Sequence, residues 1–335
     1  MCKHLHIWLV VLLGTLFTSS TLLAEGVITM TTSRTVGEII SLRIDANGDI
    51  TIEGVKETLQ TEDRVVYYTL TSQTITIRGD VTRFDCSDNQ LTSLDVSKNT
   101  SLTDLDCFNN QLMSLDVSKN TALTTLYCFD NQLTSLDVSK HTALTTLYCS
   151  ENQLTSLDVS KNTALTSLSC SDNQLTSLDV SKNTALTDLE CFNNQLTSLD
   201  LSQNTALTTL YCFDNQLTSL NVSKNRALTT LSCGGNQLTS LDVSKNTALE
   251  GLYCSENQLT SLNISGCARL EDLFCFSNCI NGKAMTKLVN SLPDRKGMSS
   301  GSLWVVDRSS KKSDKNRCSV ADVTTARKKN WEVQQ

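Results

Sequence analysis

The 335-residue sequence has few of the residue types on which enzyme active sites commonly depend. It contains three histidines, two of which, His4 and His6, lie in its first segment, so that His141 stands alone in the remainder. This shortage disfavours acid–base catalysis by histidine and a histidine metal site. The sequence has no H-E-x-x-H or C-x-x-C motif, and we expect no enzyme, no cofactor and no metal.

An excess of positive charge is also missing. The formal net charge is −7, whereas a surface that binds phosphates needs clustered lysine and arginine. We therefore expect no nucleic-acid partner.

A long apolar run is confined to the N-terminus. Residues 1–24 have a short basic start, an apolar run from Ile7 to Phe17, and a small residue at Ala24. This layout predicts a secretory signal peptide and, with no other apolar run of sufficient length, no transmembrane segment in the mature chain. We expect an exported protein at the cell surface or secreted, with the periplasm as the alternative.

What the sequence has in abundance is an internal repeat. Ten of its cysteines are spaced 21 residues apart, and an asparagine follows each of them by three positions. The cysteines are Cys86, Cys107, Cys128, Cys149, Cys170, Cys191, Cys212, Cys233, Cys254 and Cys275. The unit reads L-x-x-L-x-C-x-x-N-Q-L-T-S-L-D-V-S-K-N-T-A, which is a leucine-rich repeat with cysteine at a leucine position. It predicts ten 21-residue units over residues 81–280.

The spacing within the unit predicts its conformation. Leu147 and Cys149 alternate with Tyr148, as in a strand, while Leu154, Leu157 and Val159 turn inward from the return path. We predict a leucine-rich repeat solenoid of the α/β class, mostly β, with a parallel sheet on its concave face. The asparagine is expected to bond the turn and the neighbouring coil, a structural role.

Both ends of the array need caps, because terminal coils would expose core residues. Residues 25–80 predict a β cap, with a hairpin turn at 46–49 between strands at 38–45 and 49–55. Residues 281–335 predict a small α/β cap with helices near 283–292 and 319–330. Trp304 and Trp331 are expected to pack the core of this second cap.

The copies differ from one another mainly beside the cysteine. By strand parity, the residues before and after it point out of the sheet. The aromatic residues among them are Tyr127, Tyr148, Tyr211, Tyr253, Phe108, Phe129, Phe192, Phe213, Phe274 and Phe276. Exposed aromatic residues mark contact surfaces, so these predict a binding face. The alternative is that neighbouring rings stack to stabilise the sheet.

At these residues the chain resembles a known family. The units "LYCFDNQLTSL" and "LDCFNNQLMSL" resemble the cysteine-ladder repeats of internalin J, and still more the internalin-J-like proteins of Bacteroidetes such as Porphyromonas. The resemblance implies a surface or secreted protein that acts in adhesion, biofilm growth or host contact. The expected partner is a host or bacterial surface protein, with a glycan as a further candidate. The alternative function is a structural component of the envelope or matrix without a dedicated ligand.

The cysteines fall into two groups. Neighbouring ladder cysteines should have parallel Cβ atoms about 4.8 Å apart, whereas a disulfide needs about 3.8 Å. We expect Cys86 through Cys275 to be free thiols in the core. Cys279 and Cys318 lie outside the ladder, and the oxidising compartment favours a disulfide between them.

Overall fold

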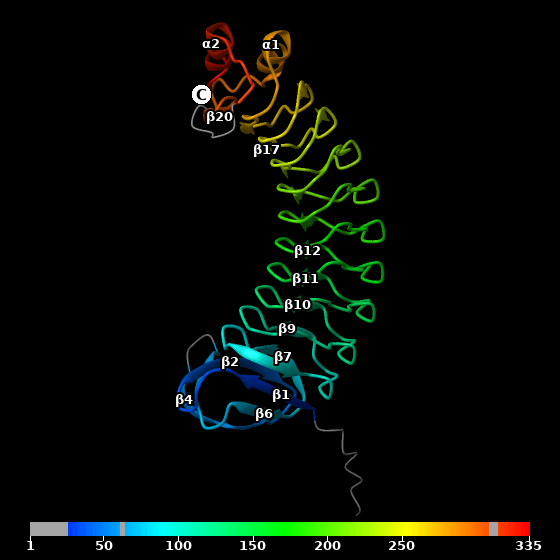
Figure 1. Cartoon of the computed structure of the whole chain (residues 1–335), viewed down its shortest axis with the longest axis vertical. Coiled ribbons are helices and arrows are strands. Elements are labelled where there is room, and N and C mark those ends of the chain that lie inside the picture. Colours follow the sequence, from blue (N-terminus) through cyan, green and yellow to red (C-terminus); the bar gives the residue numbers. More distant parts are fainter. Residues whose placement is uncertain (1–25, 61–63, 308–313) are drawn as a thin grey trace, which may run out of the picture.

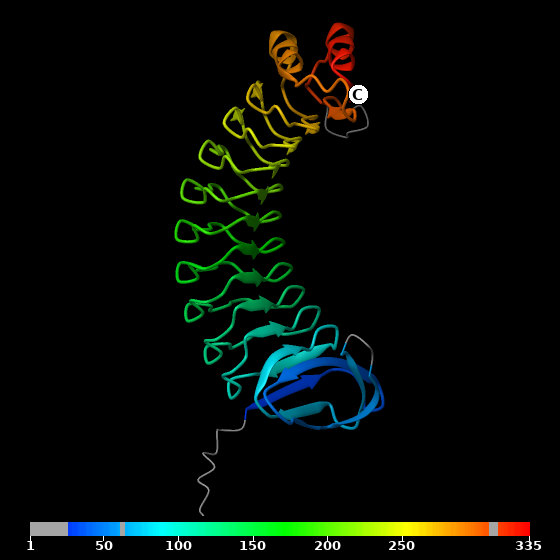
Figure 2. The same cartoon turned by 180° about the vertical axis from the view of Figure 1, so that it is seen from behind.

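The computed structural model describes residues 26–60, 64–307 and 314–335, so the predicted signal peptide lies outside the described residues. The chain forms a curved solenoid with a β cap at its N-terminal end and two helices at its C-terminal end (Figure 1). The column of short strands lies on the inner side of the curve and the return turns lie on the outer side (Figures 1 and 2). The predicted leucine-rich repeat solenoid is confirmed.

One short strand per coil builds the sheet. The strands are β7 (Val81–Asp85), β9 (Asp104–Asp106), β10 (Thr125–Tyr127), β11 (Thr146–Tyr148), β12 (Ser167–Ser169), β13 (Asp188–Glu190), β14 (Thr209–Tyr211), β15 (Thr230–Ser232), β17 (Gly251–Tyr253) and β19 (Asp272–Phe274). Each pairs in parallel with the next, and equivalent residues stand opposite one another, as Leu126 does with Leu147. Short strands also form in three return segments: β8 (Leu91–Asp95), β16 (Leu241–Asp242) and β18 (Leu262–Asn263).

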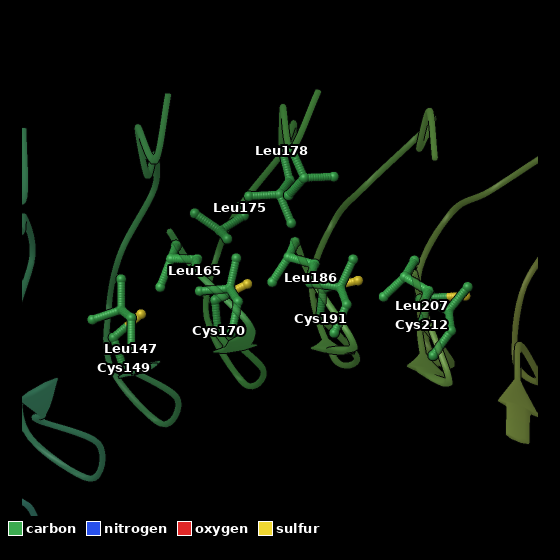
Figure 3. Packing of buried hydrophobic residues seen from close by; sticks show 14 of the residues in the cluster. Leu147, Cys149, Leu165, Cys170, Leu175, Leu178, Leu186, Cys191, Leu207 and Cys212 are labelled. Atoms are coloured by element: carbon green, nitrogen blue, oxygen red, sulfur yellow. The ribbon is translucent and has the colours of Figure 1, made fainter. Parts of the chain in front are cut away.

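The interior repeats with the same period. Figure 3 shows Cys149, Cys170, Cys191 and Cys212 in successive coils, each beside leucines of its own coil. All ten ladder cysteines are free, fully buried thiols. Burial raises the pKa of Cys233 to about 12, so this thiol stays protonated and is a poor nucleophile at neutral pH. The ladder cysteines act as small apolar core side chains.

The asparagine after each cysteine connects two coils. Asn152 donates from Nδ2 to the carbonyls of Cys149 (3.2 Å) and Cys128 (3.0 Å), and its Oδ1 accepts from the backbone N–H of Leu133 (2.9 Å). Cys128 and Leu133 belong to the preceding coil. The asparagine therefore satisfies buried backbone groups on both sides of an interface between coils.

The structure adds a second ladder, built from the asparagine of "KNT". Asn162 donates from Nδ2 to the carbonyls of Val138 (2.9 Å) and His141 (2.8 Å) of the preceding coil. His141 occupies the same position one coil earlier, is fully buried, and contacts the Val117 carbonyl through Nε2 at 3.0 Å. His141 is thus a structural residue.

The N-terminal cap holds the first coil from two sides. Its strands are β1 (Val27–Thr32), β2 (Ile39–Ala46), β3 (Thr51–Glu53), β4 (Val55–Gln60), β5 (Val66–Leu70) and β6 (Thr74–Arg78). Strand β2 pairs antiparallel with β7, and β1 pairs antiparallel with β8, so both edges of the first coil are covered. The predicted hairpin at 46–49 is wrong: β2 pairs with β5 and β7, whereas β3 pairs with β6 in the other sheet.

The C-terminal cap continues the array with a different sequence. It contains α1 (Gly282–Ser291), β20 (Gly301–Trp304), α2 (Val320–Lys328) and β21 (Trp331–Gln334), and β20 pairs in parallel with β19. Val305 is buried at the position of the cysteine. Asn316 donates to the carbonyls of Cys275 and Val305 (both 2.8 Å) and accepts from the N–H of Ile280 (2.7 Å). The cap therefore reproduces the asparagine ladder with an inserted segment.

The disulfide expected between Cys279 and Cys318 is not formed in this structure, where both are free thiols. Cys318 is half-buried and packs against the hydrophobic core. Cys279 occupies the turn position that Gln258 has in the preceding coil, where each backbone N–H donates to a leucine carbonyl one coil earlier. Ile280 and Arg317, the residues next to them, are joined by a hydrogen bond from the Arg317 N–H to the Ile280 carbonyl at 3.0 Å, and the disulfide stays a prediction.

Candidate functional site: the strand face

The outward side of the sheet, here called the strand face, consists of three columns of side chains. Two columns come from the residues directly before and after the buried central residue of each strand pairing, as Arg83 and Asp85 flank Phe84, and the third comes from the residue after the cysteine. Because the strands are in register, each column places equivalent residues side by side, about 4.8 Å apart. The predicted binding residues all stand in the second and third columns.

These aromatic residues form three groups. The first contains a stacked pair, Phe108 and Phe129 (ring centroids 4.5 Å apart, planes 6° apart), beside Tyr127 and Tyr148, whose ring centroids are 4.9 Å apart. The second contains Phe192 and Phe213, stacked at 4.3 Å and 8°, and Tyr211. The third contains Tyr253, Phe274, Phe276 and Trp304.

Trp304 is an aromatic residue of this face whose place the repeat pattern did not reveal. It lies opposite Phe274 in the sheet, its ring centroid is 4.5 Å from that of Phe276, and it is only partly buried. The expectation that Trp304 packs the core of the cap is wrong, whereas Trp331, 2 % exposed, does pack there. Aligning "SLWV" with the x-L-x-C unit would have placed Trp304 in the second column.

The strand-face rings are less exposed than strand parity alone predicts. Phe108, Phe129, Phe192 and Phe213 are partly buried, because each ring covers a face of its neighbour. The ring stacking expected as the alternative to a binding face therefore occurs. The rings nevertheless keep part of their surface open to a partner.

Carboxylates accompany all three groups, and in the third the Tyr253 hydroxyl donates a hydrogen bond to Asp272 at 3.4 Å. Asp104 and Asp106 precede Phe108, and Asp188 and Glu190 precede Phe192. Asp106 is 6 % exposed and pairs with Arg83, whose Nη2 lies 3.2 Å from Oδ2. Burial raises the pKa of the Asp106 carboxyl above its usual value, and the hydrogen bond from Arg83 opposes that rise.

One segment of the C-terminal cap matches a catalytic motif in spacing. Residues 297–301 read G-M-S-S-G, which fits G-x-S-x-G, but that motif requires a strand before the serine and a helix after it. Here the serine, Ser299, precedes strand β20, and its carbonyl and hydroxyl both accept hydrogen bonds from the buried Arg295. The segment is therefore a turn whose Ser299 accepts hydrogen bonds from Arg295, and it lacks the strand–serine–helix arrangement of the motif.

The described part of the chain contains no helix that is both long and apolar enough to cross a membrane. In the same residues, no group of three or more histidine, cysteine, aspartate or glutamate side chains is arranged to hold a metal ion.

The repeat and the fold define a leucine-rich repeat protein with a cysteine ladder. A family model described as "Leucine Rich repeats (2 copies)" matches residues 121–162. The solved functional domain of InlJ from Listeria monocytogenes, described as including a cysteine ladder, is 38 % identical with a TM-score of 0.63. The match covers 71 % of this chain and 52 % of that one, so the chain spans about half the length of the InlJ structure.

More distant structures share the fold alone. YopM from Yersinia pestis is 22 % identical (TM-score 0.53, covering 70 % of this chain and 61 % of that chain). The Arabidopsis receptor kinase HAESA, solved with the peptide hormone IDA and the co-receptor SERK1, is also 22 % identical (TM-score 0.53, covering 61 % of this chain and 39 % of that chain). Among curated proteins, no sequence matches significantly.

Proposed function

We propose that this chain is an exported adhesion or interaction protein that binds a host or bacterial surface protein through its strand face. The observation that carries the proposal is where the coils differ. The return segments are nearly identical, whereas aromatic residues and carboxylates vary along the three columns of the strand face. Interiors require uniform packing, and a surface that varies between otherwise identical coils is free to match a partner.

Two comparisons support this proposal. The InlJ domain, at 38 % identity, includes a cysteine ladder, and the HAESA receptor kinase, which shares the fold, was solved in complex with a peptide hormone. The repeat unit predicts a particular similarity to proteins of Bacteroidetes. Residues 1–24 predict export to the cell surface or the medium. A glycan is the second candidate ligand for the strand face.

The experiment is a pull-down from host and bacterial surface extracts with residues 25–335. The test variant changes four strand-face residues to serine: Tyr127, Tyr148, Phe129 and Phe213. A matched control changes four exposed lysines of the outer return segments to serine: Lys119, Lys140, Lys161 and Lys182. We expect the first variant to lose the captured protein and the second to keep it. Equal capture by both folded variants would exclude the strand face.

The ring stacking in the structure favours the second candidate function, a structural spacer in the envelope or matrix. A spacer would keep its place in the cell envelope when the strand-face rings are replaced, and would capture no partner. Fractionation of the producing cells into envelope, periplasm and medium tests the localisation at the same time.

A further inference from the structure

Two of the aromatic groups are copies of one site. We define the N-terminal aromatic site as Asp104, Asp106, Phe108, Tyr127 and Phe129, on strands β9 and β10 and two residues beyond their ends. The central aromatic site comprises Asp188, Glu190, Phe192, Tyr211 and Phe213, in the same places on and after β13 and β14. Four steps along the sheet, or about 19 Å, separate them. Each residue of one site has a counterpart of the same chemical type in the other.

The two sites also match in geometry. Their phenylalanine pairs stack at 4.5 and 4.3 Å with nearly parallel planes. Asp104 accepts a hydrogen bond from the Thr103 hydroxyl at 2.7 Å, and Asp188 accepts one from the Thr187 hydroxyl at the same distance. In both sites the acidic residue of the second column stands beside a tyrosine of the next strand, Asp106 by Tyr127 and Glu190 by Tyr211.

The strands beside the two sites carry different residues, and the difference that matters for charge is Arg83 on the preceding strand. Arg83 stands opposite Asp104 in the sheet and reaches Asp106, so the N-terminal aromatic site already contains a guanidinium group. At the equivalent place, opposite Asp188, the chain has Ser167. Glu190 instead accepts a hydrogen bond from the Ser169 hydroxyl at 2.9 Å, and it is paired with no cation of the described residues.

The strand face around the two sites is negatively charged, as the sites themselves are. In the three columns from β7 to β19, all within the described residues, Arg83 is the one basic side chain. The acidic side chains of these columns are Asp85, Asp104, Asp106, Asp188, Glu190 and Asp272. A negative surface attracts a positive partner and repels a negative one. The rings beside the carboxylates can contact the apolar stem of a long basic side chain.

We propose that the central aromatic site binds an arginine or lysine side chain of a protein partner, in the position that Arg83 fills within the N-terminal aromatic site. This inference rests on the proposed function and specifies the chemistry of the partner: a basic segment. Arg83 shows that a guanidinium group from the preceding strand reaches the acidic residue of the second column. The partner would supply the same group from outside.

The experiment measures binding of an acetylated, amidated tetra-arginine peptide to residues 25–335 by titration calorimetry at about 0.15 M salt, where the Debye length is about 8 Å, with a tetra-glutamate peptide as the negative probe. Ser167→Arg should fill the central aromatic site from within and weaken peptide binding by at least about tenfold, the loss expected for a close charge pair. Ser156→Arg adds the same charge on an exposed part of the return segment and should leave binding within about twofold, because exposed distant charges are screened.

Two further variants keep the test decisive. Glu190→Gln preserves the shape of the side chain and should cause a similar loss, which covers the case in which Ser167→Arg fails to fold. Arg83→Ser should open the N-terminal aromatic site and raise the stoichiometry from one peptide to two.

Equal binding by wild type, Ser167→Arg and Glu190→Gln would overturn the inference, as would tighter binding of tetra-glutamate. The proposed function fails separately. If the pull-down still depends on the strand-face rings but not on Ser167→Arg, a protein partner binds there without using a basic side chain in this site.

Discussion

The buried interior of the coils and their strand face differ in how strictly the sequence repeats. Inside, each coil repeats leucine, cysteine and asparagine at fixed positions, and even His141 and Val305 take over a neighbour's place and contacts. On the strand face, adjacent coils carry residues as different as Tyr148 and Ser169 at the same position in the sheet. Uniformity marks positions at which every coil meets the same neighbour, and variation marks positions that meet no other coil's core.

The two surfaces should therefore respond differently to substitution. Substitution of an interior residue should destabilise the protein whichever coil it lies in. Substitution of a strand-face residue should weaken binding while the fold persists. Four substitutions test this contrast, in decreasing order of their expected effect on the free energy of unfolding.

Replacing an asparagine of the first ladder should have the largest effect. Asn173→Ala removes hydrogen bonds to the carbonyls of Cys149 (3.0 Å) and Cys170 (3.2 Å) and leaves the N–H of Leu154 without its acceptor. These groups are buried, so we expect the free energy of unfolding to fall by about 3–5 kcal/mol. Urea denaturation measures it. A loss below about 1 kcal/mol would mean that water replaces the amide.

Changing a ladder cysteine should have the next largest effect. Cys170→Ser places a hydroxyl group among fully buried leucines and should cost about 1–3 kcal/mol. Cys170→Ala, which removes the sulfur without adding a polar group, is the matched control and should cost less. Serine as the better-tolerated residue would show that this position is polar, contrary to its role as an apolar core residue.

A strand-face ring should contribute little to stability. Phe192→Ser breaks the stack with Phe213, which is worth about 0.5–1.5 kcal/mol, and serine is compatible with the fold there because Ser171 holds the same column one coil earlier. Thermal unfolding measures the stability, and the pull-down measures binding. If the unfolding free energy falls as far as in Asn173→Ala, the ring belongs to the core and the contrast is wrong.

The smallest effect is expected on the outer return turns. The N–H and hydroxyl of Ser181 hold the pKa of the exposed Asp179 carboxyl below its usual value. A lowered folded-state pKa gives stability above the unfolded-state pKa of about 3.9, and this stability is lost as pH falls through the folded-state value.

Asp179→Asn should therefore flatten the fall of the melting temperature between pH 5 and pH 2. Asn221 already makes the equivalent hydrogen bond to the N–H of Ser223 at 3.1 Å, so asparagine is structurally acceptable at this position. An identical pH dependence in wild type and variant would show that this carboxyl does not contribute.

Much of the array was predictable because one period governs it. The 21-residue spacing predicted the coils, the parallel strands, the buried leucines and cysteines, and the columns to which the aromatic residues belong. Prediction failed at the ends. The turn at 46–49 links strands of two different sheets. Trp304 lies on the strand face in an eleventh unit, which the pattern did not predict because a segment is inserted into that unit.

The candidate site was half predictable in the same way. Parity put the aromatic residues on one face, but the ring stacking, the ion pair between Arg83 and Asp106, and the serine in place of that arginine near Glu190 concern contacts between coils. Such contacts depend on which rotamers neighbouring side chains adopt, and a repeat pattern does not specify these.

The sequence by itself determined the solenoid, because a 21-residue unit that cannot bury its own apolar side chains must stack on its neighbours. Only the tertiary structure decided how the array is closed and which strand-face groups are already partnered. The caps do not share the repeat, so their strands find their places by pairing with the first and last coils. The pairing of charges depends on side chains that parallel stacking brings together across the sheet.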